Sequence, residues 1–289
     1  MNDLVTYLSD EPIALITVVS IFGLIVGSFL NVVIHRLPLM MEREWREQCH
    51  EFLGLPVEPS GPSWNLIVPR SHCPKCGHSI SALENIPILS YLWQKGRCTA
   101  CQQAISIRYP LIELISGILA AITAWHFGWG WSLLGALIFT WALIAASAID
   151  FDHQLLPDDI ILPLLWLGIF CNIFELYTSL RESVLGAMAG YLILWSIYWA
   201  FKLVVGKEGM GRGDFKLLAM LGAWAGWLYL PLIILISSLV GAIVGVSLII
   251  WRGHDRNTPI PFGPYLATAG WLSLLWGYPL TQFYFKWIP

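Results

Sequence analysis

Long apolar runs follow one another through this chain, and they constrain its fold more than any other feature. A helix of about 20 mostly apolar residues spans a bilayer, and seven runs are close to that length or longer. They are 13–34, 109–127, 131–149, 159–177, 183–205, 229–251 and 264–285. An eighth run, 215–227, is shorter and either crosses the bilayer or enters it only part of the way. We therefore predict an all-α polytopic membrane protein with about eight transmembrane helices.

The charge content agrees with this class of protein. Only 12% of the 289 residues are charged and 57% are hydrophobic, whereas about 25% of the residues in a soluble domain are charged. The net charge of -3 gives no indication of a nucleic acid partner. Membrane lipid is the expected surrounding.

The positions of Lys and Arg predict the orientation of the helices. Segments 35–108, 202–216 and 252–256 would all face one side, and together they hold fourteen of the sixteen basic residues. The opposite side keeps only Arg181 and Lys286. Because cytoplasmic loops are rich in Lys and Arg, we predict that these segments are cytoplasmic and that both termini are periplasmic.

This orientation suggests three parts in the chain. Residues 1–35 would form the first transmembrane helix, 36–108 a small cytoplasmic loop domain, and 109–289 the remaining membrane core. The predicted helices carry four Gly-x-x-x-Gly pairs, whose small residues let helix backbones approach closely in lipid. The pairs are Gly23/Gly27, Gly186/Gly190, Gly222/Gly226 and Gly241/Gly245.

The loop domain carries two C-x2-C motifs separated by twenty-one residues, formed by Cys73, Cys76, Cys98 and Cys101. Two such turns can close a tetrahedral Zn²⁺ site, and Gly77 suits a turn after the second cysteine. Stable disulfides are disfavoured on a cytoplasmic face, and a redox pair would explain only one of the motifs. We predict a structural zinc site with these four thiolates as ligands.

The other candidate metal ligands have simpler interpretations. Four sulfur ligands leave no coordination position for His72 or His78, which we interpret as surface residues or as residues that support the ligands. Cys49 is interpreted as a loop thiol and Cys171 as a buried apolar residue.

Acidic residues occur at two polar breaks between apolar runs. Asp150 directly follows the run 131–149, and Asp152 lies two residues further on, on a different helix face. Asp158 and Asp159 precede the next run, and we expect them to cap that helix at its positive end.

The second break, 207–216, is rich in glycine and carries Asp214 just before the run 215–227. Taken alone, Asp214 could equally be a helix cap. Two carboxyl groups about 3 Å apart share one proton, so that an ionised one can activate water while a neutral one protonates the scissile amide. The pair Asp150 and Asp214 would suit this chemistry, although spacing alone does not bring together residues 64 positions apart.

Several motifs occur in order along most of the chain. They are the stretch 27–38 (Gly-Ser-Phe-Leu-Asn-Val-Val-Ile-His-Arg-Leu-Pro), the paired cysteines of 73–101, Arg108-Tyr109-Pro110-Leu111-Ile112-Glu113, the segment 150–157, Gly211-Arg212-Gly213-Asp214 and Pro261-Phe262-Gly263-Pro264. In these motifs the sequence resembles the type IV prepilin peptidases, also called prepilin leader peptidase/N-methyltransferases. These are bacterial inner-membrane aspartic proteases of the GxGD class.

The resemblance implies that Asp150 and Asp214 form the catalytic dyad. It also implies that the enzyme removes a short basic leader, after a glycine, from prepilins and from the pseudopilins of type II secretion. N-methylation of the new amino terminus would follow, with S-adenosylmethionine as the methyl donor. The resemblance assigns no residues to the donor: we attribute Gly209, Gly211 and Gly213 to the peptidase, since a dinucleotide-binding glycine pattern would need a βαβ context. Glu113 could contact the substrate amine or the donor, but a charge near a helix start is its simpler role.

Two other classes of function explain less of the sequence. A proton-coupled membrane transporter would explain acids in membrane segments, but it predicts charges in mid-span and leaves the cysteine motifs unexplained. A non-catalytic scaffold would use the zinc loop for partners, but it gives Asp150 and Asp214 no chemical role.

Overall fold

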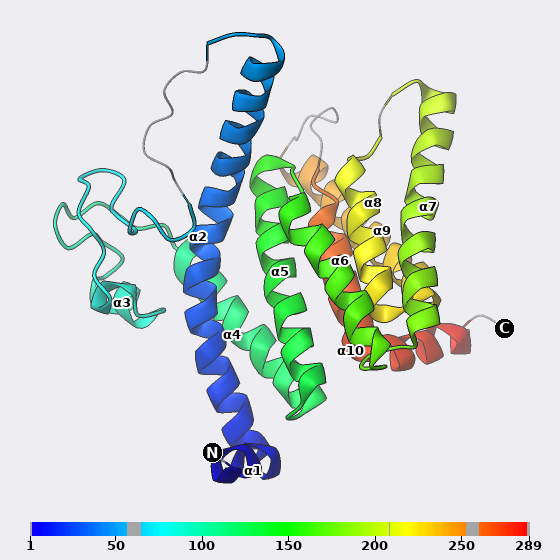
Figure 1. Cartoon of the computed structure of the whole chain (residues 1–289), viewed down its shortest axis with the longest axis horizontal. Coiled ribbons are helices and arrows are strands. Elements are labelled where there is room, and N and C mark those ends of the chain that lie inside the picture. The colour runs from blue at the N-terminus through cyan, green and yellow to red at the C-terminus, as the bar shows by residue number, and fades with distance from the viewer. Residues whose placement is uncertain (1, 57–64, 208, 253–259, 288–289) are drawn as a thin grey trace. The chain divides into compact units, whose positions relative to one another are not determined.

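The structure is a computed structural model that describes residues 2–56, 65–207, 209–252 and 260–287. Its elements are helices and loops (Figure 1). The α-helices are α1 (Asn2–Asp10), α2 (Pro12–Phe52), α3 (Leu89–Trp93), α4 (Arg108–Phe127), α5 (Trp131–His153), α6 (Asp158–Ile173), α7 (Leu180–Val205), α8 (Arg212–Ala225), α9 (Leu230–Arg252) and α10 (Gly263–Trp287), with 3-10 turns at Leu83–Asn85 and Trp227–Tyr229. The all-α prediction is confirmed.

The predicted count of about eight transmembrane helices is not confirmed. Within the described residues, five helices are long and apolar enough to cross a membrane: Pro12–Phe52, Arg108–Phe127, Trp131–His153, Leu180–Val205 and Trp227–Leu248. Helices α6 and α8 have 16 and 14 residues. At about 1.5 Å per residue they are shorter than a hydrocarbon core of about 30 Å.

The chain divides into two compact units, an N-terminal unit (Met1–Trp129) and a C-terminal unit (Gly130–Pro289). The domain boundary predicted at residue 35 falls inside α2, which continues as one helix of 41 residues to Phe52. The three-part division of the chain, with boundaries at 35 and 108, stays a prediction.

In the N-terminal unit, α2 packs against α4 through glycines. A Cβ added at Gly23 would lie 2.7 Å from the Cβ of Ala120, and one added at Gly27 would lie 2.7 Å from the Cα of Glu113. The Ser116 hydroxyl donates to the Gly23 carbonyl at 2.6 Å. The first Gly-x-x-x-Gly pair therefore serves close helix packing, as predicted.

In the C-terminal unit, α8 is the central helix and contacts α6, α7 and α10. Nearly all of its residues from Asp214 onward are buried. The fully buried Trp224 donates to the Leu164 carbonyl at 2.8 Å and packs on Phe139 with ring centroids 4.8 Å apart. A helix that is surrounded by other helices needs no polar face. The neighbouring helices therefore account for the apolar character of this short run.

The packing of α7 on α8 leads to a first prediction. The Gly186 and Gly222 backbones touch, and a Cβ at either position would collide with the other residue's carbonyl. Because backbone cannot easily move aside, we expect Gly222→Ala to lower the free energy of unfolding by about 1–3 kcal/mol. Thermal unfolding in detergent would measure this. Gly245→Ala is the control, since its Cβ would meet only the Ile260 Cδ1 atom at 3.3 Å. Equal melting temperatures for the two variants would contradict the prediction.

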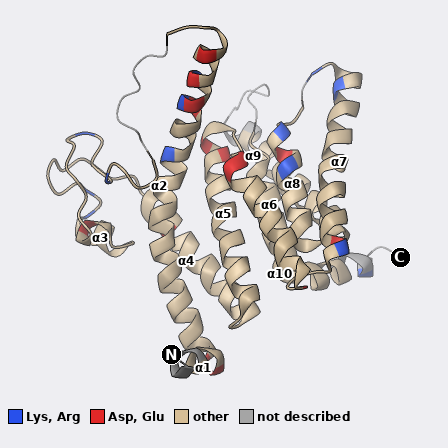
Figure 2. Cartoon of the chain, in the orientation of Figure 1, with Lys and Arg blue, Asp and Glu red and all other residues tan. Residues whose placement is uncertain are grey.

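The polar breaks of the C-terminal unit gather at one end of its helices. Figure 2 shows the acids at the end of α5 and start of α6 at the same end as the basic residues of the α7–α8 connection. The segments 150–159 and 209–216 therefore lie at the same end of the C-terminal unit.

Candidate active site

Asp150 lies in the last turn of α5 and is buried, with 6% of its surface exposed. The helix ends at Gln154, a left-handed residue (φ +52°) whose N–H donates to the Asp150 carbonyl at 2.9 Å. The side-chain Oδ2 atom accepts a hydrogen bond of 3.0 Å from the Gly263 N–H. Because Gly263 begins α10, the carboxyl group of Asp150 sits on the positive end of that helix.

Asp214 lies in the first turn of α8 and is equally buried, with 6% exposed. Its carboxyl group interacts with the backbone N–H of Gly211, the N-cap residue of α8. This is the geometry of one half of a capping box. The helix-cap role considered for Asp214 is thus compatible with the structure, but that role does not require a buried acid.

The structure brings the two acids into one neighbourhood. Leu156 packs against the backbone beside both of them. A Cβ at Gly213 would lie 2.8 Å from the Leu156 Cβ, and one at Gly263 would lie 3.1 Å from the Leu156 Cδ2. Two buried carboxyl groups that lie close together would favour a shared proton.

The neighbouring acids have other surroundings. Asp152 is exposed. Asp158 and Asp159 lie in the first turn of α6, as expected for charges at its positive end, but Pro157 is the N-cap residue and no side-chain capping bond forms. Asp158 instead accepts from the Lys216 Nζ atom at 2.8 and 2.7 Å. This ion pair joins α6 to α8 beside the site.

Sequence reasoning did not single out Gly263 or Lys216. The only signal for Gly263 was the turn Pro261-Phe262-Gly263-Pro264. Its function is visible only once the turn reaches Asp150, since a Cβ at Gly263 would lie 2.6 Å from the Asp150 Oδ2 atom. Only glycine fits between that carboxyl group and the backbone.

We predict that Gly263→Ala lowers the rate of any reaction that uses Asp150. The methyl group would displace the carboxyl group, and a displacement of about 1 Å costs on the order of 10²-fold in rate. Steady-state kinetics would show a fall in kcat with the melting temperature as folding control. The matched variant is again Gly245→Ala. Unchanged kcat in Gly263→Ala would mean that this turn does not position Asp150.

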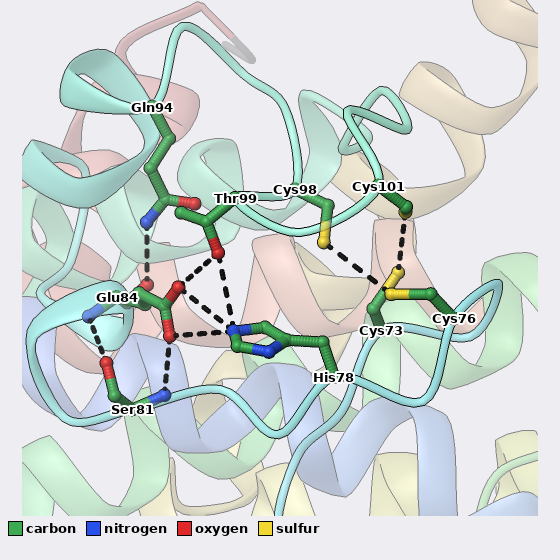
Figure 3. A network of polar contacts seen from close by, with 9 residues as sticks. All are labelled: Cys73, Cys76, His78, Ser81, Glu84, Gln94, Cys98, Thr99 and Cys101. Carbon is green, nitrogen blue, oxygen red and sulfur yellow. Dashed lines mark hydrogen bonds and ion pairs between the residues drawn. The ribbon is translucent and has the colours of Figure 1, made fainter.

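The four predicted metal ligands come together in the N-terminal unit. The Sγ atoms of Cys73, Cys76, Cys98 and Cys101 all lie within 4.8 Å of one another (Figure 3). The Cys73–Cys101 sulfurs are 3.7 Å apart and the Cys76–Cys98 sulfurs 4.0 Å. Tetrahedral ligands about 2.3 Å from Zn²⁺ would be about 3.8 Å apart. The cluster therefore fits a closed four-sulfur zinc site.

The two C-x2-C turns repeat one backbone pattern. In the first turn, the Cys73 N–H donates to the His78 carbonyl and the Gly77 N–H to the Cys73 carbonyl, both at 2.9 Å. In the second turn, the Cys98 N–H donates to the Gln103 carbonyl at 2.9 Å, and the Gln102 N–H donates to the Cys98 carbonyl at 3.0 Å. Gly77 and Gln102, each just after the second cysteine, are left-handed (φ +72° and +58°). The turn predicted at Gly77 is confirmed. Backbone N–H groups of Cys76 and Lys75 lower the pKa of the Cys73 thiol to about 6. Although the backbone N–H of His78 lowers the pKa of Cys76, burial and the other three thiols raise it to about 12. Without a metal, Cys73 is therefore the thiolate of this pair and Cys76 the thiol.

His78 supports the cluster without belonging to it. Its Nε2 atom lies 3.2 Å from Glu84 Oε1 and 3.3 Å from the Thr99 hydroxyl, which itself donates to Glu84 (Figure 3). Hydrogen bonds from Thr99 and from the Ser81 backbone lower the pKa of Glu84 to about 2. Since His78 follows the first turn and Thr99 lies within the second, Glu84 joins the two halves. The His72 side chain is exposed, and its Nδ1 atom lies 3.2 Å from the Arg70 carbonyl.

The two single cysteines lie outside the cluster. Cys171 is buried, as expected, whereas the prediction of a loop thiol at Cys49 is wrong: Cys49 is exposed but lies in α2, which continues to Phe52.

Comparison with known proteins identifies two matching family models. The bacterial peptidase A24 N-terminal domain matches residues 21–127, which include the four cysteines. The type IV leader peptidase family matches residues 137–246, which include Asp150 and Asp214. No solved structure matches the chain.

Curated relatives cover nearly the whole chain. Proteins named prepilin leader peptidase/N-methyltransferase from Stutzerimonas stutzeri and Pseudomonas aeruginosa are each 56% identical to it, over 98% of both chains. The protein of that name from Aeromonas salmonicida is 57% identical over 93% of both chains.

Proposed function

Because the chain belongs to the type IV leader peptidase family, we propose that it cleaves the leader peptides of prepilins and N-methylates the new amino terminus. The relatives that support this carry both activities in their names and align over nearly their full length. By the same resemblance, we extend the substrates to the pseudopilins of type II secretion. The enzyme would act in the bacterial inner membrane, with the cysteine cluster and both acids cytoplasmic and the termini periplasmic.

One observation carries the peptidase proposal: Asp150 and Asp214 are both buried at helix ends, and Gly213 and Gly263, which lie beside them, both pack on Leu156. The ionised carboxylate takes a proton from a water molecule, whose oxygen attacks the scissile carbonyl carbon. The neutral carboxyl group gives its proton to the amide nitrogen, and the C–N bond breaks. The Gly263 N–H holds Asp150 in position for this work.

Two further components complete the proposal. S-adenosylmethionine supplies the methyl group when bound. A zinc ion held by Cys73, Cys76, Cys98 and Cys101 stabilises the fold of the loop; four thiolate ligands leave it no open position for substrate.

The proton-coupled transporter remains the alternative class, and the positions of the acids disfavour it. Glu113, Asp150 and Asp214 are the buried acids of the described residues. Asp150 is in the last turn of α5, Asp214 in the first turn of α8, and Glu113 is the sixth residue of α4. A relay across the membrane would need acids in mid-span.

The test is a reaction of the purified protein with a prepilin, with and without S-adenosylmethionine, followed by mass spectrometry. We expect the mass of the leader to be lost in both reactions, and the mass of one methyl group to be added only with the donor. An intact prepilin would overturn the peptidase assignment, and a shortened but unmethylated product would overturn the methyltransferase assignment.

A further inference from the structure

Glu113 is a buried acid that the peptidase mechanism does not use. It lies in α4, packed against α2, and only 8% of its surface is exposed. Its carboxylate accepts a 2.7 Å hydrogen bond from the Ile88 N–H and interacts with the Ser28 hydroxyl. None of the described Lys, Arg or His residues forms an ion pair with it. A buried carboxylate with only neutral donors lacks a compensating cation, and acids within membrane helices are functional by default.

The donor to this carboxylate is held in a strained conformation. Ile88 has φ +60° and ψ -49°, and the Leu89 N–H bonds the Pro87 carbonyl across it at 2.5 Å. This is a γ-turn of the rare, strained type, at a β-branched residue for which positive φ is exceptional. Strain of this kind clusters at ligand and catalytic sites. Here it directs the Ile88 N–H at Glu113.

Polar groups lead from Glu113 to the surface of the N-terminal unit. The half-buried Ser28 bonds the exposed Asn85 at 3.3 Å. Asn31, three residues along the same face of α2, donates to the Tyr109 carbonyl at 3.1 Å. We call Ser28, Asn31, Asn85 and Glu113 the Glu113 cluster. Glu113 is the sixth residue of α4, so it lies about 8 Å along the helix axis from the loop that carries the cysteines.

We propose that Glu113 binds the α-amino group of the cleaved chain and accepts its proton for methylation. This inference rests on the proposed function. An ammonium group offers three N–H donors to a carboxylate. The amino group of the cleaved chain must also lose a proton before it can be methylated, and a buried carboxylate without a cation beside it can accept that proton.

Proton transfer comes before methyl transfer in this step. The ammonium gives one proton to the Glu113 carboxylate and becomes a neutral amine. Its nitrogen attacks the methyl carbon of the sulfonium donor; the C–S bond breaks, and its electron pair stays on sulfur as a thioether. The product is a methylammonium group, and Glu113 returns its proton to solvent.

Glu113→Gln tests the proposal without releasing the loop, because a Gln carbonyl still accepts the Ile88 N–H. We expect the rate of methylation of an already cleaved chain to fall by about 10²-fold or more. The rate of leader removal should change less than about twofold, as for a substitution distant from the reacting groups. Glu51→Gln, an exposed acid of the same unit, should change neither rate.

Peptide binding gives a second readout that needs no methyl transfer. A peptide with the amino-terminal sequence of the cleaved chain should bind the wild type more tightly with a free amine than with an acetylated one. In Glu113→Gln this preference should disappear. Unchanged methylation, an unchanged amine preference, or an equal loss of cleavage and methylation would each overturn the inference. If the wild type prefers the free amine but does not methylate, the methyltransferase assignment fails while the amine site stands.

Discussion

Asp150→Asn and Asp214→Asn are each expected to abolish leader removal, with kcat reduced by about 10²–10⁴-fold. Asn has nearly the same shape as Asp but can neither take a proton from water nor give one to the amide. Both side chains are buried, and the amide oxygen introduced by Asp150→Asn would still accept the Gly263 N–H, so the fold should remain. Cleavage of purified prepilin over time, with melting temperatures as folding control, measures the effect.

The control for this prediction lies two residues away. Asp152 is on the same break but exposed, so Asp152→Asn should cleave at about the wild-type rate. If Asp150→Asn or Asp214→Asn kept full activity, that residue would leave the proposed dyad. A melting temperature equal to or above that of the wild type is expected in both, since buried acids at catalytic sites cost stability.

Local sequence patterns were sufficient to predict the parts of the site whose residues lie close together in the sequence. Each C-x2-C motif determines its own turn, as the matching bonds around Cys73 and Cys98 demonstrate. Asp150 and Asp214 stood out because each ends or begins an apolar run. What brings the two acids together is the packing of α10 against both α5 and α8, and no local pattern encodes that.

The remaining features that the sequence did not predict also depend on contacts between distant parts of the chain or on burial that hydropathy does not resolve. An apolar run shows that a segment is buried, but lipid and protein bury it equally well. The run of α8 is buried by other helices, so its hydropathy alone does not determine whether it also crosses the bilayer. The pairing of Asp158 with Lys216 and the role of Gly263 depend on contacts across 58 and 113 positions. The continuation of α2 to Phe52 follows from good helix formers after Pro38, which a boundary based on hydropathy overlooks.

Removal of zinc is expected to unfold the loop that follows α2. Binding of structural zinc by short cysteine motifs supplies about 10–16 kcal/mol. The other interactions that hold the described part of this loop are single hydrogen bonds and one small network. They include the Glu84 network, the Ile88–Glu113 bond, and the bonds from Arg36 to the Asn65 and Pro69 carbonyls at 2.9 and 2.7 Å. We expect one zinc per chain in the purified protein. Cys73→Ser, or a strong chelator, should make 65–107 sensitive to limited proteolysis.

Cys49→Ser is the matched control, because Cys49 is an exposed cysteine outside the cluster. It should keep its zinc and its resistance to protease. Freshly purified protein without zinc, or a Cys73→Ser loop as resistant as the wild type, would contradict the structural role of the metal.

The loss of zinc should also separate the two proposed activities. The loop supplies Asn85 to the Glu113 cluster, and the Ile88 N–H that bonds Glu113. Asp150, Asp214 and Gly263 belong to the C-terminal unit. Methylation of a chain that has already been cleaved should therefore fall more steeply than leader removal in Cys73→Ser. If leader removal fell as far as methylation, the loop would be needed for the whole enzyme, and this separation of the two activities would be contradicted.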